Sequence, residues 1–245
     1  METEEKNAFD RLEALSYLPF DSEVFGFPFF RLIADAGNSL SRDLESLSKL
    51  NLPAFGCDAK VSVTDGSGVM QLQEEGFIHV CDQVTYDIST ANSKFLPEVD
   101  AVELTDMDAT EISSHAENFR EDRLSRDSRI PNATIKRFYS KWIANSFTFP
   151  GKTIYSLQSG FCITHLRQDV LKIDLVSVLK KRKGVGSRLI KHTLARASQA
   201  KISCVEVTTE SHNAGAIKVY SRNGFREKER SSCLHLFHYR KQSSD

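Results

Sequence analysis

The chain has 245 residues, enough for one large domain or two small ones with an ample core. Its hydrophobic content of 40%, its charged content of 27% and its net charge of −1 are ordinary for a globular protein, and they exclude a general attraction to nucleic acid or membranes. The N-terminus is acidic and polar, unlike a signal peptide, and no apolar run is long enough to span a membrane, so we expect a cytoplasmic protein.

The five cysteines are widely spaced, odd in number and contain no C-x-x-C pair. This pattern favours buried, reduced thiols over disulfides or a metal site. The cysteines are Cys57, Cys81, Cys162, Cys204 and Cys233.

In the N-terminal part, residues 16–33 hold many aromatics around Pro and Gly, which predicts turns leading into a buried strand. Leucines at helical spacing predict a helix over 39–50. A strand at 59–65, a short helix at 69–75 and an alternating strand at 77–88 follow.

The polar segment 89–98 contains a proline and marks the expected domain boundary. We therefore predict an N-terminal domain over 1–97 and a C-terminal domain over 98–245.

The C-terminal part alternates strands and helices. It begins with a strand, an Asp cap and a helix over 101–119, then a second helix over 133–147. The predicted elements after it are strands 155–166 and 170–178, helix 186–200, strand 202–210, helix 212–225 and a last strand 231–240.

One weak internal repeat, called the echo below, occurs in both parts of the chain. Segments 69–88 and 217–237 share the order short helix, Gly-Phe, long strand. This weak repeat suggests that the N-terminal domain is a partial copy of the C-terminal one.

A basic glycine turn, "KKRKGVGSRL", follows a β-branched strand and opens a helix. Glycines let the backbone approach a ligand closely, and the helix N-terminus adds unpaired N–H groups and partial positive charge, which together suit a pyrophosphate. The turn is not a P-loop, and Leu189 stands where a dinucleotide fingerprint needs its third glycine. The alternative is a plain surface turn with solvated basic residues.

Lys181–Gly186 at this helix start, followed by Asn213–Phe225 with the pattern N-x-x-A-x-x-x-Y-x-x-x-G-F, resembles the GNAT acyltransferases. Lys181 departs from the Arg or Gln of the family but keeps the cation. The resemblance implies an α+β fold, with a central mixed, splayed β-sheet flanked by helices, and a smaller N-terminal α/β domain resembling a truncated GNAT. It also implies acetyl-CoA as cosubstrate and no metal.

The resemblance implies that the strand before the turn binds pantetheine through its backbone, at Val176, Ser177 and Val178. These could equally be ordinary strand residues. The other implied cofactor contacts are Lys181, Arg182, Lys183, Gly184, Val185, Gly186, Ser187 and Asn213.

Tyr220 lies about two helical turns after Asn213 and so on the same helix face. A phenol near a thioester sulfur can protonate the departing thiolate, and the resemblance implies this general-acid role for Tyr220. The alternative is an Asn N-cap followed by a core tyrosine, and Asn213 is expected to be an N-cap in either case.

No side chain stands out as the general base. Glu206, Glu210, Asp174 and His165 lie on or beside the relevant strands, and a water chain could serve instead. No cysteine occupies a nucleophile position near the motif, so we expect direct attack without an acyl-enzyme.

Three further segments, "DSEVFGF", "FREDRLSRDSRIPNATIKRFYSKWI" and "VTTESHNAGAIKVY", resemble the TDP-fucosamine N-acetyltransferase branch of the GNAT family. That branch acetylates a nucleotide-linked 4-amino-4,6-dideoxy sugar for cell-surface polysaccharide biosynthesis. Leu124 stands where the branch has Phe.

Between residues 119 and 141, basic residues outnumber acids. Arginine can hold phosphate with two parallel bonds, so this segment suits a diphosphate-linked sugar, and Arg123 matches the mid-chain Arg of the branch. Tyr139 and Trp142 could line a sugar or base site. The alternatives are a solvated helix with local salt bridges and aromatics that belong to the core.

The leading hypothesis is therefore an N-acetyltransferase for a nucleotide-sugar amine. Rival hypotheses are acetylation of a protein or small-molecule amine, a non-catalytic domain that binds acyl-CoA or a partner protein, and nucleic-acid binding, against which the net charge counts. The aromatic N-terminal segment could pack internally or at a homodimer interface.

Overall fold

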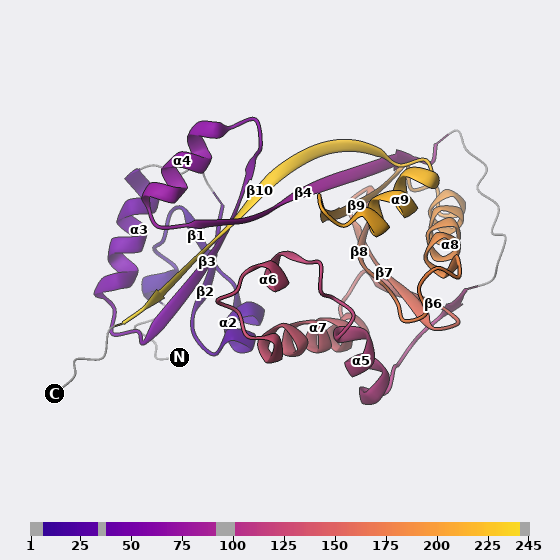
Figure 1. Cartoon of the computed structure of the whole chain (residues 1–245), viewed down its shortest axis with the longest axis horizontal. Helices are drawn as coiled ribbons and strands as arrows, with labels where there is room; N and C mark the ends of the chain where they lie inside the picture. The colour runs from indigo at the N-terminus through magenta and orange to yellow at the C-terminus, as the bar shows by residue number, and fades with distance from the viewer. Residues whose placement is uncertain (1–6, 34–37, 92–100, 241–245) are drawn as a thin grey trace. The chain divides into compact units, whose positions relative to one another are not determined.

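The computed structural model describes residues 7–33, 38–91 and 101–240. The chain divides into two compact units, one formed by residues up to Asp82 together with Ser231 onward, the other by Gln83–Arg230 (Figure 1). The predicted domain boundary between residues 97 and 98 lies outside the described residues and stays a prediction. Two strands, β4 (Ile78–Ser89) and β10 (Arg226–Tyr239), contribute residues to both units.

The first unit is a short mixed sheet in the order β1-β2-β3-β10, in which β2 and β3 are parallel and the other pairs antiparallel. Its further strands are β1 (Leu15–Tyr17), β2 (Phe29–Leu32) and β3 (Ala54–Ser62), and its helices are α2 (Pro19–Phe25), α3 (Asn38–Lys49) and α4 (Gly66–Glu74).

Helix α3 buries its predicted leucine stripe. Leu40, Leu44 and Leu47 join the core of the first unit with Phe30 and Phe55 from the strands. The predicted helix and the strand at "FFRLI" are thus confirmed.

Helix α2 was not predicted, because the aromatic run from residue 16 to 33 indicated turns only. Pro19 occupies its first turn and Gly26, with a φ of 81°, ends it. The seven residues from Pro19 to Phe25 were enough for a helix whose periodicity the aromatics obscured.

The second unit is a mixed sheet in the order β4-β9-β8-β7-β6-β5, with β8 and β9 parallel and the other neighbours antiparallel. Its further strands are β5 (Val102–Glu103), β6 (Lys152–Leu157), β7 (Gly160–Arg167), β8 (Val170–Val178) and β9 (Cys204–Glu210). Its helices are α5 (Ala109–Ala116), α6 (Arg123–Arg126), α7 (Asn132–Ser146), α8 (Val185–Gln199) and α9 (Ala214–Arg222).

Helices cover both faces of this second sheet. Leu189 and Ile190 of α8 and Tyr220 of α9 pack with strand residues such as Val205 in one buried cluster. On the opposite face α5 approaches β7, where the rings of His115 and Phe161 are 4.7 Å apart. The mixed sheet with flanking helices confirms the predicted α+β class.

The prediction of one strand over 155–166 is wrong. Two strands, β6 and β7, replace it, because Gln158 adopts a positive φ of 54° and turns the chain before Gly160. A Cβ on Gly160 would lie 3.0 Å from Ser177 O and from Val185 Cγ1, so this glycine allows β7, β8 and α8 to meet closely.

The echo between segments 69–88 and 217–237 has a structural counterpart. Gly76 after α4 and Gly224 after α9 both have left-handed backbones, with φ of 89° and 88°. The next residues, Phe77 and Phe225, are both buried. That one unit is a partial copy of the other stays a prediction.

All five cysteines are free thiols, and four are buried, as expected, while Cys204 is half-buried. Among the described residues, no helix is long and apolar enough to cross a membrane.

The contact between β2 and β3 gives a test of the packing. An added Cβ at Gly56 would lie 2.5 Å from Cε2 of Phe29, a ring that is 1% exposed and has nowhere to move. We expect Gly56→Ala to lower the free energy of unfolding by about 1–3 kcal/mol, because it overpacks the core.

Thermal or denaturant melts measure this change. The matched control is Gly66→Ala in the first turn of α4, where an added Cβ meets nothing within 4 Å. It should leave stability unchanged or raise it by about 0.5–1 kcal/mol. A Gly56→Ala protein as stable as the Gly66→Ala protein would contradict the packing described for Phe29.

Candidate functional site

Strands β8 and β9 separate part-way along their length. They pair from Val170 with Cys204 to Ile173 with Val207. Beyond this point, within the described residues, β8 pairs with β7 alone and the end of β9 with β4 alone. The facing backbone edges of the two strands are then open to hydrogen bonds with a ligand.

A β-bulge marks the point of separation. Ile163 pairs with Leu175 but Thr164 pairs with Ile173, so Asp174 is an extra residue in β8. The bulge reverses the alternation of side chains. Leu171 and Ile173 lie in the cluster with α8 and α9, yet beyond the bulge the residues packed against this cluster are Val176 and Val178.

The predicted backbone contacts therefore lie where the strands separate. Val176 and Val178 point toward α8, whereas Ser177 is 1% exposed and points to α5. There Ser177 Oγ lies 2.8 Å from Nδ1 of His115 and accepts a hydrogen bond of 3.1 Å from Asn118 Nδ2. Asn118 Nδ2 also donates to Val178 O at 3.3 Å, so these contacts fix the end of β8 and occupy part of its backbone edge toward β9.

The glycine turn leads directly into α8. Gly184 is the N-cap, with a φ of 76°, and α8 has no side-chain cap, so its first N–H groups are left for a ligand. A Cβ at Gly184 would meet nothing within 4 Å, and one at Gly186 only Val178 Cγ2 at 3.7 Å. The glycines thus keep open a space that protein atoms do not fill.

Lys181, Arg182 and Lys183 are exposed beside this helix N-terminus. Arg182 also has a left-handed φ of 64°. The basic side chains, the open N–H groups and the helix dipole fit the phosphates of a coenzyme A derivative.

Val185 and Ser187 serve packing as well. Val185 is buried in the cluster under α8, and Ser187 Oγ exchanges hydrogen bonds with the Asn223 side chain after α9, at 3.0 and 3.3 Å. The side chain of Ser187 therefore joins α8 to α9, and its backbone remains the group able to contact a ligand.

Asn213 is the N-cap of α9, as predicted. Its Oδ1 accepts from Ala216 N at 3.1 Å, and its own N donates to Glu210 O at 3.0 Å. These bonds attach α9 to the end of β9, where the strand has separated from β8.

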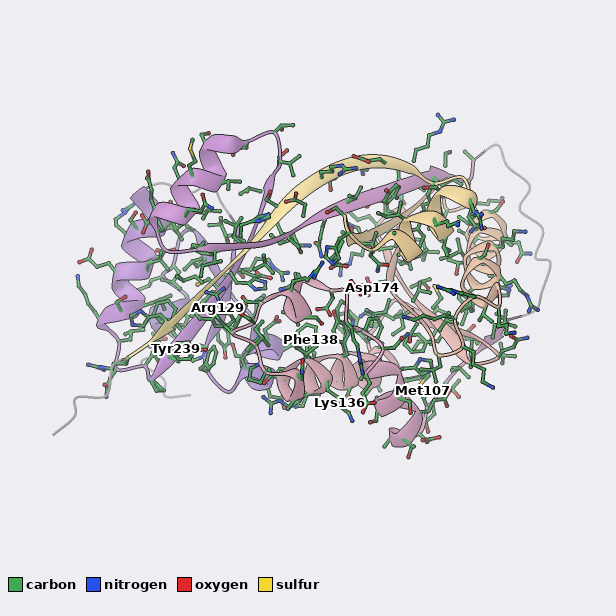
Figure 2. The ribbon with its side chains drawn as sticks, viewed as in Figure 1. Met107, Arg129, Lys136, Phe138, Asp174 and Tyr239 are labelled. Atoms are coloured by element: carbon green, nitrogen blue, oxygen red, sulfur yellow. The ribbon has the colours of Figure 1, made fainter. Side chains whose placement is uncertain are left out.

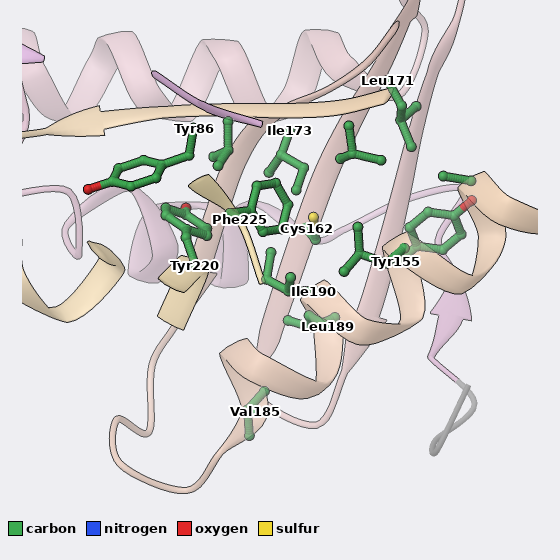
Figure 3. Close-up of a cluster of buried hydrophobic side chains, with 14 of the residues drawn as sticks. Tyr86, Tyr155, Cys162, Leu171, Ile173, Val185, Leu189, Ile190, Tyr220 and Phe225 are labelled. Atoms are coloured by element: carbon green, nitrogen blue, oxygen red, sulfur yellow. The ribbon is translucent and has the colours of Figure 1, made fainter. Parts of the chain in front are cut away.

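Tyr220 lies on the inward face of α9 and is 6% exposed. Its ring is 5.8 Å from that of Phe225 and 6.3 Å from that of Tyr86 (Figure 3). Within the described residues its hydroxyl makes no hydrogen bond. Burial raises the pKa of Tyr220 well above its usual value, and the nearby Cys162 and Glu210 raise it further. The phenol therefore stays protonated across the neutral range.

Tyr220 is thus a core residue whose hydroxyl makes no hydrogen bond within the described residues. Its role as general acid stays a prediction. Nearby, burial raises the pKa of the Cys162 thiol to about 12, so this cysteine is no thiolate nucleophile.

The basic segment neutralises part of its own charge. Arg129 makes a two-bond ion pair with buried Asp127, and Lys136 pairs with Glu117. Figure 2 shows Lys136 on the side of α7 away from buried Phe138. The local salt bridges considered as an alternative are therefore present. Both side-chain hydrogen bonds described for the Arg129 guanidinium go to Asp127, not to a ligand.

Tyr139 and Trp142 occupy different environments on α7. Tyr139 is 5% exposed and stacks on Phe119, with ring centroids 4.2 Å apart. Burial raises the pKa of Tyr139 well above its usual value, helped by the charges of Asp122 and Glu210. Trp142 is half-buried, and Lys152 Nζ lies 5.7 Å from its ring centroid.

Arg123 begins α6 and joins this group. Its backbone N lies 3.3 Å from Glu210 Oε1, and its charge lowers the pKa of Tyr139. The structure thus brings Arg123 and Tyr139 together at the end of β9, with Glu210 between them and Tyr220, while Trp142 lies one turn further along α7.

The other carboxylates considered as bases have cationic neighbours. Asp174 Oδ2 lies 2.9 Å from Lys152 Nζ, an ion pair whose geometry is not that of a hydrogen bond, and 3.8 Å from His165 Nδ1. Asp174 lies inside the second unit, as Figure 2 shows. Glu206 is paired with Lys172 and Lys228.

His165 is also a poor base. Arg167 Nε donates to its Nδ1 at 3.1 Å, and burial together with the Arg167 charge lowers the pKa of His165. Among the described residues, no group of three or more His, Cys, Asp or Glu side chains is placed to hold a metal ion.

Sequence patterns did not indicate Gln83, Asp122, His115 or Asn118, yet all four hold the site together. Asp122 caps α6 through Leu124 N, and its sequence signal was an Asp before a short helix inside a basic run. Gln83 sits in an alternating strand, where nothing distinguishes it from a solvent-facing polar residue.

Comparison with known proteins places this site in a family. Residues 158–225, from the β6–β7 turn to Phe225, match the acetyltransferase (GNAT) family. Among curated protein sequences, none matches the chain.

Solved structures share the fold across nearly the whole chain. A GCN5-related N-acetyltransferase from Sphaerobacter thermophilus is 13% identical over 91% of this chain and 76% of its own, with a TM-score of 0.59. A putative GNAT acetyltransferase from Novosphingobium aromaticivorans is 16% identical over 97% and 94%, with a TM-score of 0.54. A tandem GNAT protein from the clavulanic acid biosynthesis pathway is 12% identical over 89% and 77%, with a TM-score of 0.56.

The structural likeness shows the fold, and the sequence match covers the part that contains the strand separation, the glycine turn and Tyr220. Residues 158–225 therefore match the GNAT acetyltransferase family, and the chain as a whole shares the fold of solved GNAT structures.

Proposed function

We propose that this acetyltransferase moves the acetyl group of acetyl-CoA to the amine of a nucleotide-linked 4-amino-4,6-dideoxy sugar, by direct attack, with Tyr220 as general acid. The observation that supports it most is the protonated phenol of Tyr220, uncommitted in hydrogen bonding and carried on the helix attached to the separated end of β9.

The cofactor would be held by three features described above. The N–H groups at the start of α8 and the basic side chains of Lys181–Lys183 suit the phosphates. The open edge of Val176–Val178 suits the pantetheine amides. A thioester at the end of this path would lie near α9.

The coenzyme A thiolate that leaves during the transfer needs a proton. As the amine nitrogen attacks the carbonyl carbon and the C–S bond breaks, the hydroxyl of Tyr220 donates its proton to sulfur. A phenol in low dielectric holds this proton until the stronger base appears, because charge is costly there. The buried Cys162 thiol, with its pKa raised to about 12, gives no competing acyl-enzyme path.

The acceptor class rests on the sequence likeness to the TDP-fucosamine branch and on the position of Arg123 at the end of β9. The salt bridges of Arg129 and Lys136 leave less of the basic segment for phosphate than its composition suggested. Acetylation of another small amine is the second candidate, favoured by the same salt bridges.

A thiol-release assay with acetyl-CoA tests the acceptor. The panel holds dTDP-4-amino-4,6-dideoxy sugars of both C4 epimers, UDP-amino sugars, polyamines and basic peptides. We expect turnover with a dTDP-amino sugar. Turnover with peptides or polyamines alone would keep the acetyltransferase and contradict the sugar acceptor.

The role of Tyr220 is tested by Tyr220→Phe. We expect kcat to fall about 100-fold, because the thiolate then leaves without a positioned acid, while the Kd of acetyl-CoA changes less than about twofold. Because the raised pKa keeps the phenol protonated, wild-type kcat should not decline up to about pH 9.5, just below the usual tyrosine pKa. Unchanged kcat in Tyr220→Phe at saturating substrates would remove the acid role.

The phosphate cradle is tested by Gly186→Glu, which places a side chain and a negative charge in the open space at the start of α8. Calorimetry should show acetyl-CoA binding weakened at least about tenfold, because like charges repel and the N–H groups are covered. The matched control, Gly66→Glu, makes the same change in the first turn of α4, at a position equally open. Equal affinity in the two variants would refute the cradle.

A further inference from the structure

One face of the β4–β9 pair is polar. Gln83 lies opposite Glu210 and Thr85 opposite Thr208, so these side chains point to the same side, away from the cluster under α8. Thr85 and Thr208 are 3.0 Å apart across the strands. This polar face continues to the end of β9, where Arg123 and Tyr139 approach.

Glu210 differs from the other buried carboxylates of this face. Asp174 lies beside Lys152, and Glu206 beside Lys172 and Lys228. Glu210 is 8% exposed, and within the described part of the chain it has no ion pair. A buried carboxylate without a cation is costly unless a cation or proton donor joins it.

Within the described residues, the neighbours of Glu210 donate hydrogen bonds to one of its carboxylate oxygens, Oε1, and not to the other, Oε2. Gln83 Nε2 donates to Oε1 at 2.8 Å, and Arg123 N lies 3.3 Å from the same oxygen. Among the described residues, no hydrogen bond reaches Oε2.

Gln83 leaves a second acceptor beside the first. Its amide must present Nε2 to the carboxylate, because its oxygen would repel it, and this fixes Oε1 on the other side. Oε1 is buried and has no hydrogen-bond partner in the described structure. Within the described residues, two adjacent oxygens, one of them on a carboxylate, thus lack donors at the end of β9, and a primary ammonium group has three N–H donors, enough to reach both.

We propose that Glu210 and Gln83 form the site of the acceptor's amino group, with Glu210 as the base that removes its proton. This inference rests on the proposed function and names the groups that recognise the amine. The ligand class is a primary ammonium ion, held by Glu210 Oε2 and Gln83 Oε1. Tyr220 lies on α9, which begins four residues after Glu210, so the proposed acid and base come from adjoining parts of the chain.

The proton balance closes without another reactant. Glu210 takes one proton from the ammonium group and later passes it to solvent. The neutral nitrogen then forms the C–N bond as the C–S bond breaks. The second nitrogen proton is released as the amide forms, and the thiolate receives a proton from Tyr220, which regains one from solvent. The sum is ammonium plus acetyl-CoA giving amide, free thiol and one proton.

The charged and titratable groups around Glu210 come from several elements. Asp122 and Arg123 at the start of α6, Tyr139 of α7 and Tyr220 of α9 are electrostatically linked to Glu210 or to each other. His212, two residues further on, faces the α6 loop instead, with Nε2 3.0 Å from Glu121 O and 3.1 Å from Arg126 Nε.

The test is the pH profile of kcat/KM for Glu210→Gln, with the panel amine that the wild-type enzyme acetylates best. The wild type accepts the ammonium form, so its kcat/KM should be nearly flat below the pKa of the free amine. The variant must use the neutral amine from solution, so its kcat/KM should fall about 100-fold near neutral pH and rise about tenfold per pH unit toward the amine pKa. A purely structural role would lower the profile without changing its slope, and that result overturns the proposal.

Gln83→Met separates binding from proton transfer. It removes the second acceptor while Glu210 remains, so KM for the amine should rise about tenfold with the slope of the wild-type profile retained. Glu206→Gln is the matched control, on the same strand and face, and should keep the wild-type slope. A changed slope in Glu206→Gln, or an unchanged KM in Gln83→Met, would count against the site.

Thermal melts give a readout that does not need turnover. Glu210→Gln removes an uncompensated buried charge and should melt at or above the wild-type temperature, whereas Glu206→Gln leaves two lysines unpaired and should melt about 2–4 °C lower. If the wild type acetylates no amine, the proposed function fails on its own. If Glu210→Gln melts at a lower temperature than Glu206→Gln, the claim that Glu210 is a buried carboxylate without a cationic partner is refuted, whatever the turnover assay shows.

Discussion

The second unit depends on one constraint, the end of pairing between β8 and β9 after Ile173 and Val207. Parallel strands normally satisfy each other's backbone groups, and separating them exposes donors and acceptors that must find other partners. The bulge at Asp174 coincides with the separation and turns Ser177 toward α5, where His115 and Asn118 hold it. The strand end is thus fixed from the α5 side, and because Asn118 also bonds Val178 O, only part of its other edge stays open.

The same separation brings the proposed acid, Tyr220, and the proposed base, Glu210, into one region. The end of β9 stays paired with β4, which brings Gln83 to Glu210, and the chain then turns directly into α9 and Tyr220. Burial favours the neutral form of the Tyr220 phenol. Glu210 Oε1 accepts hydrogen bonds from Gln83 Nε2 and Arg123 N, which hold the carboxylate at the end of β9.

Sequence analysis predicted most of the second unit because its signals are local. The Asn213 cap, the glycine turn and the Gly-Phe step after α9 each act within a few residues. The sequence did not predict α2, merged β6 and β7 into one strand and did not indicate Gln83, because aromatic packing, the φ of Gln158 and the partner of a strand residue depend on contacts distant in sequence. In segment 119–141, Asp127 and Glu117 neutralise part of the basic charge, so the salt bridges expected as the alternative are present, and phosphate binding by the segment stays a prediction.

The order helix, Gly-Phe, strand occurs once in each unit of the chain. In both instances a left-handed glycine ends the helix and a buried phenylalanine begins the strand, so the same local chemistry starts β4 and β10. Only the second instance carries a tyrosine on its helix beside an unpaired carboxylate, since α4 offers Met70, Gln71 and Leu72 on the corresponding stretch. The residues proposed for acid–base chemistry, Tyr220, Glu210 and Gln83, all lie in the second unit, and Gln83 is where β4 enters that unit.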